Sequence, residues 1–94
     1  MGSIPSALCG EVDLATAGAF RADLYTRVDR CDTPLVVIDL GDVTFIDSAG
    51  FHALVDATEY ALGRGHVMVI RNVSSFYVEM LRICDWDNEL RFVA

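Results

Sequence analysis

Two short runs of branched apolar residues constrain the fold of this chain more than any other feature. The run "LVVIDL", Leu35–Leu40, is nearly continuous in apolar character, and a second run, "HVMVIRNV", begins at His66. Such runs are typical of strands covered on both faces in a parallel sheet. The segment "ELRFVA" near the C-terminus predicts a short third strand. An N-terminal strand would have to lie within Ile4–Cys9, where Pro5 indicates an edge position.

Helical patterns separate these predicted strands. Apolar residues recur at helical spacing at Ala15, Ala19, Phe20, Leu24 and Val28, and again at Phe51, Leu54, Val55, Thr58 and Leu62. A third helix is expected from about Ser74 to Cys84, with an inward stripe formed by Tyr77, Met80, Leu81 and Cys84. The pair Gly63 and Gly65 predicts the end of the middle helix and a turn. Strands and helices that alternate with short loops predict an α/β domain with a largely parallel sheet.

Length and hydropathy favour one globular domain, residues 1–94. The chain has 53% apolar residues, which argues against disorder, and its apolar runs are far shorter than the roughly 20 residues that span a bilayer. We therefore expect no direct insertion into a membrane. Residues 1–6 contain no basic residue and no apolar segment of the kind found in signal peptides, so a cytoplasmic location is expected.

Charge and cysteine content exclude several kinds of site. The net charge is -7, from 14 acidic and 7 basic residues, and such a surface repels nucleic acid phosphates. The three cysteines, Cys9, Cys31 and Cys84, fit neither a disulfide framework nor the paired spacing of a metal site, and are expected to be buried or partly buried thiols. No nucleic acid partner, metal or cofactor is expected.

The polar cluster Asp47-Ser48-Ala49-Gly50 marks the expected site. It lies within Gly41–Gly50, which is expected to form a loop between the strand Leu35–Leu40 and the middle helix. In open parallel sheets, sites form beyond the carboxyl ends of the strands. Ser48 is therefore placed where a functional group would be expected.

Three interpretations of Ser48 follow from the residues around it. A hydrolase would need a base such as His52, but Ile46 stands where a nucleophile elbow, G-x-S-x-G, has its first glycine, so hydrolysis is disfavoured. Asp47 or Ser48 could simply cap the helix. Alternatively, Ser48 is a regulatory target whose phosphate would be tolerated at a helix N-terminus and would alter partner docking.

The capping interpretation and the regulatory interpretation both place Ser48 at the start of the middle helix. They differ in whether the residues beside Ser48 form a surface that a partner contacts. Small residues at Ala49 and Gly50 would keep the helix start flat and open to another surface, since glycine otherwise costs about 1 kcal/mol in a helix. His52, Asp56 and Glu59 continue the outer stripe from Ser48 and form a mostly acidic face.

These segments resemble the STAS domain family (sulfate transporter and anti-sigma factor antagonist), and specifically its stand-alone bacterial anti-sigma factor antagonists. The similar segments are "GEVD" at Gly10–Asp13, a turn before the first helix, "VVIDLGDVTFIDSAGFHAL", and "NVSSFYVEMLRICDWDNELRF". The resemblance implies a mixed, mostly parallel sheet of about four strands with three to four helices, and an N-terminal strand that is short or missing.

The resemblance also implies a partner-switching regulator without enzymatic activity. The unphosphorylated protein would bind an anti-sigma factor serine kinase and release the sigma factor. Phosphorylation of Ser48 would end this binding, and a PP2C-type phosphatase would restore it. The implied partner-binding residues are Asp13, Asp47, Ala49, Gly50, Phe51 and His52.

Two features leave alternatives open. Few residues precede Gly10, so an uncovered sheet edge could favour a homodimer. The sequence Asp-Ser-Ala-Gly, with Ala49 where the family has a second hydroxyl residue, would also suit a STAS subunit of a bacterial ABC-type lipid transport complex. Such a subunit would dock constitutively to its partners.

Overall fold

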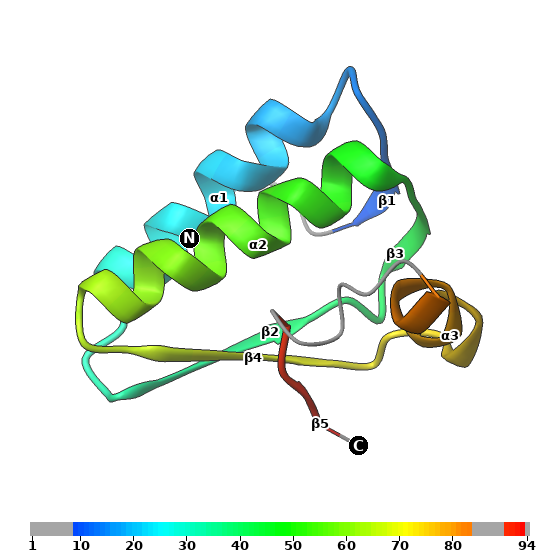
Figure 1. Cartoon of the computed structure of the whole chain (residues 1–94). Helices are drawn as coiled ribbons and strands as arrows, with labels where there is room; N and C mark the ends of the chain where they lie inside the picture. The colour runs from blue at the N-terminus through cyan, green and yellow to red at the C-terminus, as the bar shows by residue number, and fades with distance from the viewer. Residues whose placement is uncertain (1–8, 84–89, 94) are drawn as a thin grey trace.

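The computed structural model describes residues 9–83 and 90–93, which form five strands and three helices (Figure 1). Along the chain these are β1 (Gly10–Val12), α1 (Ala17–Arg30), β2 (Leu35–Asp39), β3 (Val43–Ile46), α2 (Ser48–Gly63), β4 (Val67–Arg71), α3 (Ser75–Ile83) and β5 (Phe92–Val93). This order confirms the predicted α/β class.

The described strands form two small parallel sheets. One contains β1 and β3, and the other has the order β2-β4-β5. The register of the larger sheet pairs Leu35 with Val67 and Asp39 with Arg71. Residues 40–42 lead directly from β2 into β3, so the two sheets share a continuous stretch of chain. The mostly parallel pairing was expected, but the division of the strands between two sheets was not.

Two of the strands were not predicted. The segment interpreted as a turn before the first helix contains β1, and the segment interpreted as a loop after β2 contains β3. These strands are three and four residues long, too short for a clear pattern of alternating burial. Of the N-terminal strand expected within Ile4–Cys9, residues 4–8 lie outside the described residues, and Cys9 precedes β1 as an exposed residue.

Within the described residues, the larger sheet is buried on one face. Val36 and Ile38 in β2 are buried, whereas Leu35 and Val37 are 49% and 46% exposed. Figure 1 shows α1 and α2 side by side over one face of β2 and β4. The expectation that this strand would be covered on both faces is therefore wrong for the described residues.

The helices bury the predicted apolar stripes in part. In α1, Phe20, Leu24 and Val28 are buried but Ala19 is exposed, and Ala15 lies exposed in the turn before the helix. In α2, the buried residues include Phe51, Leu54 and Thr58, while Leu62 at the helix end is exposed. Together with apolar residues of β2, β3 and β4 they form one continuous core.

The ends of the helices follow ordinary capping chemistry. The Ser74 hydroxyl accepts a hydrogen bond from the Phe76 N–H at 3.2 Å, as expected for a residue that precedes a helix. Gly65 has a φ of +81°, which confirms the predicted turn after α2. In α3, Tyr77 and Met80 are half-buried, and Cys84 lies outside the described residues. Among the described helices, none is long and apolar enough to cross a membrane.

Candidate functional site

The junction between β3 and α2 is built around Asp47. Its backbone is extended, and its Oδ1 accepts hydrogen bonds from the N–H groups of Ala49 at 2.9 Å and Gly50 at 3.3 Å. These bonds satisfy two of the N–H groups that a helix start leaves without intrahelical partners. Asp47 is therefore the N-cap of α2, one of the two capping residues that the sequence allowed.

Ser48 is the first residue of α2 and is exposed. The positive end of the helix dipole lies there, so a negative charge on the serine would be stabilised by the fold. His52 and Glu59 are exposed farther along α2, and Asp56 is half-buried. The Arg21 Nε lies 3.2 Å from the Asp56 Oδ2, so the face that was predicted to be mostly acidic is partly neutralised by α1.

Gly50 has a packing role that the sequence did not reveal. It is buried, and a Cβ atom placed on it would lie 2.5 Å from the Ile46 Cγ1 and 2.8 Å from the Val12 Cγ1. Glycine is required because α2 begins in close contact with β1 and β3. The interpretation that Gly50 keeps the outer surface of the helix flat for a partner is therefore wrong. The small residue is needed on the inner side, where α2 packs on Ile46 and Val12.

Phe51 also points inward. It is 2% exposed, and its ring meets that of Tyr77 edge-to-face with centroids 6.0 Å apart. Of the six residues predicted to contact a partner, Gly50 and Phe51 therefore lie beneath the surface. Ser48 and His52 are exposed, and Asp13, Asp47 and Ala49 are half-buried.

Asp13 lies at the same edge of the smaller sheet as Asp47. Val12 pairs with Ile46 in the parallel register, and the Asp47 N–H donates to the Val12 carbonyl at 3.1 Å. The carboxyl ends of β1 and β3 therefore lie next to each other, and each is followed at once by an aspartate. This register is compatible with Asp13 and Asp47 belonging to one partner-binding surface, as the family resemblance implied.

The carboxylate of Asp13 is engaged by its own loop. Its Oδ1 accepts from the N–H groups of Ala15 and Thr16 at 3.0 and 3.1 Å, and the Thr16 Oγ1 lies 3.2 Å from it. The Thr16 Oγ1 in turn accepts from the Asp13 N–H at 2.9 Å. Thr16 is not among the residues predicted for the site, although an aspartate in a loop before a helix often accepts hydrogen bonds from backbone N–H groups two or three residues on.

Tyr77, predicted as part of the inward stripe of the third helix, also contacts the site. Its hydroxyl oxygen accepts a hydrogen bond from the Ile46 N–H at 3.4 Å, so α3 supports the chain two residues before Ser48. No signal in the sequence places these residues together, because they are 31 positions apart. The edge-to-face contact of Tyr77 with Phe51 adds a second link from α3 to the start of α2.

The geometry gives little support to hydrolysis. Ser48 and His52 lie one turn apart on the same helix, and the Asp47 carboxylate caps that helix. A catalytic acid would instead orient the imidazole of the base. Within the described residues, no group of three His, Cys, Asp or Glu side chains could hold a metal ion.

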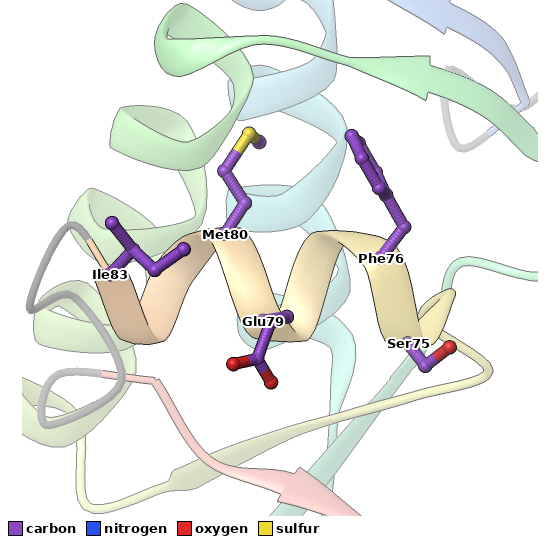
Figure 2. Close-up of a pocket in the computed structure, with 5 residues that line it drawn as sticks. All are labelled: Ser75, Phe76, Glu79, Met80 and Ile83. Atoms are coloured by element: carbon purple, nitrogen blue, oxygen red, sulfur yellow. The ribbon is translucent and has the colours of Figure 1, made fainter.

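Two other surface features lie outside the β3–α2 junction. Asp39 accepts hydrogen bonds from the Gly41 N–H, the Asn72 amide and the Arg71 guanidinium, which hold its pKa below the ordinary value. All of these donors serve to close the ends of β2 and β4. Figure 2 shows a mostly apolar groove along α3, lined by Ser75, Phe76, Glu79, Met80 and Ile83. Its one carboxylate, Glu79, pairs with Arg82, so the lining of the groove offers few polar groups that could bind a ligand or take part in a reaction.

The fold and the β3–α2 junction together define a small α/β domain that presents a serine at a helix N-terminus. A profile of the family described as "Mlab, STAS domain" matches residues 7–93, and the chain belongs to this family. None of the curated proteins matches the chain in sequence.

Solved structures agree with this assignment of the fold. The anti-sigma factor antagonist SpoIIAA in its unphosphorylated form has a TM-score of 0.66 at 13% identity, over 99% of this chain and 84% of that one. A sulfate transporter family protein from Wolinella succinogenes has a TM-score of 0.59 at 20% identity, over 97% of this chain and 80% of that one. At these identities the likeness concerns the fold alone.

Proposed function

We propose that this protein is an anti-sigma factor antagonist controlled by phosphorylation of Ser48. The observation that carries the proposal is the exposed Ser48 hydroxyl at the first position of α2, next to the N-cap Asp47. A phosphate there would face the positive end of the helix, where the fold tolerates it. The unphosphorylated form binds an anti-sigma factor serine kinase, and the phosphorylated form does not.

The chemistry of the proposed switch belongs to the partners. The kinase transfers the γ-phosphoryl group of ATP to the Ser48 Oγ, the serine proton is lost, and ADP leaves. A PP2C-type phosphatase hydrolyses the phosphoserine with water and returns serine and inorganic phosphate. The antagonist itself supplies an accessible acceptor on a rigid helix start and needs no catalytic group. Similarity in fold to SpoIIAA, an anti-sigma factor antagonist, supports this proposal.

A phosphorylation assay tests the assignment of the acceptor. The purified protein is incubated with MgATP and purified serine kinases of the anti-sigma class from the source organism, and the products are mapped by peptide mass spectrometry. Phosphate is expected on Ser48 and absent from Ser48→Ala. Transfer to a different serine, with Ser48 unmodified, would contradict the proposal.

A second function is favoured by one observation. The matched family is described by the name Mlab, and a sulfate transporter family protein shares the fold. A STAS subunit of an ABC-type lipid transport complex would use the same exposed helix start to dock constitutively. Affinity capture separates the two functions: retention of a transport ATPase or permease by both wild type and Ser48→Glu, unchanged by ATP, would favour the transport subunit.

A further inference from the structure

The loop between β1 and α1 presents an exposed leucine. Leu14 is 83% exposed, the largest fraction among the exposed large apolar side chains of the described residues. It directly follows Asp13, one of the predicted partner-binding residues. An apolar side chain in this position gains no stability for the isolated fold, because it remains in water.

Hydrogen bonds hold the backbone on both sides of Leu14. The Asp13 carboxylate accepts from the Ala15 and Thr16 N–H groups, and the Thr16 hydroxyl donates to the Glu11 carbonyl at 3.0 Å. The Asp13 carbonyl also accepts from the N–H of Ala17, the first residue of α1, at 2.8 Å. Leu14 therefore extends from a loop whose conformation is already fixed before any partner binds.

The same edge of the smaller sheet carries Ser48. Two contacts place the loop after β1 beside the start of α2. They are the parallel pairing of β1 with β3 and the hydrogen bond from the Asp47 N–H to the Val12 carbonyl. Leu14 follows Val12 by two residues, and Ser48 follows Asp47 directly. A partner that reaches the Ser48 hydroxyl thus approaches the edge from which Leu14 projects.

We propose that Leu14 is an apolar anchor for the serine kinase that acts on Ser48, and that Asp13 positions this anchor. The inference rests on the proposed function and adds to it the residue that supplies binding energy. Affinity in protein interfaces is concentrated in a few side chains that fill pockets, and preorganised loops lose little entropy on binding. The kinase is accordingly expected to carry an apolar pocket that accepts one leucine side chain, beside the site that takes the serine.

The role of Asp13 differs from the one that the family resemblance implied. Its carboxylate Oδ1 is occupied by two backbone N–H donors of its own loop, those of Ala15 and Thr16. Asparagine at this position could keep the acceptor oxygen and lose the charge. If Asp13 acts through the loop, Asp13→Asn should bind nearly as well as wild type, whereas a direct ion pair with the kinase would be lost.

Titration calorimetry tests both the anchor role of Leu14 and the positioning role of Asp13. The probe is a purified anti-sigma factor serine kinase in MgADP. Leu14→Ala is expected to weaken binding roughly tenfold or more, and Asp13→Asn less than about threefold. Leu62→Ala is the matched control, because Leu62 is also exposed, at 51%, but lies at the far end of α2. It should bind like wild type.

Ser48→Asp separates this inference from the proposed function. If Ser48→Asp abolishes binding but Leu14→Ala binds as tightly as Leu62→Ala, the anchor is overturned and the switch stands. If Asp13→Asn weakens binding as strongly as Leu14→Ala, the positioning role of Asp13 is overturned. If Ser48→Asp binds as tightly as wild type, the proposed function fails.

Discussion

The backbone N–H of Asp47 donates to the carbonyl oxygen of Val12 at 3.1 Å, and this bond joins the ends of β1 and β3. It brings the loop that begins with Asp13 beside the helix start that carries Ser48. Beneath the bond, Gly50 lets α2 approach Ile46 and Val12 closely. The exposed part of the candidate site is therefore set by packing in the layer below it.

Substitution of Gly50 tests this close approach. Gly50→Ala is expected to lower the free energy of unfolding by about 1–3 kcal/mol, because the new methyl group would overlap Ile46 and Val12. Urea denaturation followed by circular dichroism gives the value. Gly18→Ala is the matched control, since a Cβ atom at Gly18, in α1, meets nothing within 4 Å. It should raise stability by up to about 1 kcal/mol, and equal effects of the two substitutions would contradict the packing argument.

The N-cap of α2 leads to a second prediction. Asp47→Ala removes the acceptor for the Ala49 and Gly50 N–H groups and should destabilise the fold by about 1 kcal/mol. Asp47→Asn retains a side-chain acceptor and should cost much less. Thermal unfolding of both variants at the same pH makes the comparison, and a loss as large for asparagine as for alanine would show that the carboxylate charge, not the cap, is what matters.

Much of the fold was predictable because its central elements are long and regular. The strands that contain Val36, Ile38, Met68 and Ile70 and the helix around Leu24 carry clear apolar patterns. The short strands β1 and β3 could not be recognised, since each has a single fully buried residue, Val12 or Ile46. The one-sided exposure of β2 was missed because its exposed face carries the apolar residues Leu35 and Val37 before Asp39.

The site was predictable where local chemistry defines it. A helix start with its N-cap at Asp47 or Ser48 follows from residue type and order alone, and the structure selects Asp47 as the cap. The inward position of Phe51 follows from the apolar stripe of the middle helix, which conflicts with its place among the predicted partner-binding residues. The inward position of Gly50 could not be predicted, because it depends on its close approach to Val12 and Ile46. The hydrogen bonds of the Asp13–Thr16 loop are local, so the aspartate before the first helix was a signal for them in the sequence.

An aromatic cluster between α1 and α2 provides a prediction that depends on pH. Tyr25 and Tyr60 stack with centroids 4.2 Å apart, and the Tyr60 hydroxyl donates to the Asp29 Oδ1 at 2.7 Å. This hydrogen bond, together with partial desolvation, raises the pKa of Tyr60 above its ordinary value. The hydrogen bond from Tyr60 to Asp29 therefore stabilises the fold fully below the pKa of an unfolded tyrosine, about 10. This stabilisation is lost as the pH rises through the pKa of Tyr60 in the folded protein.

Absorbance titration of the tyrosinate groups measures this shift. The chain has three tyrosines, and the Tyr60→Phe variant should lose the phase that titrates at the higher pH. Asp29→Asn should move that phase toward an ordinary pKa, because the charged acceptor is removed. A wild-type titration in which Tyr60 ionises at an ordinary pKa would contradict the assigned hydrogen bond.

A negative charge at Ser48 should leave the fold intact. Because Ser48 is the first residue of α2, Ser48→Asp places a carboxylate at the positive end of the helix dipole. The free energy of unfolding should rise by about 0.3–1 kcal/mol at low ionic strength and lose this gain in high salt. Ser48→Asn is the neutral control. A destabilised Ser48→Asp would mean that loss of binding in this variant reports unfolding.

The most direct test is the affinity of the serine kinase for the same protein with and without phosphate on Ser48. Calorimetry in MgADP compares the unmodified protein, the enzymatically phosphorylated protein and Ser48→Ala. Inserting a dianion into a docked interface without a compensating cation should cost several kcal/mol, so the phosphorylated form is expected to bind at least about a hundredfold more weakly. Equal affinity of the unmodified and phosphorylated forms would contradict the switch.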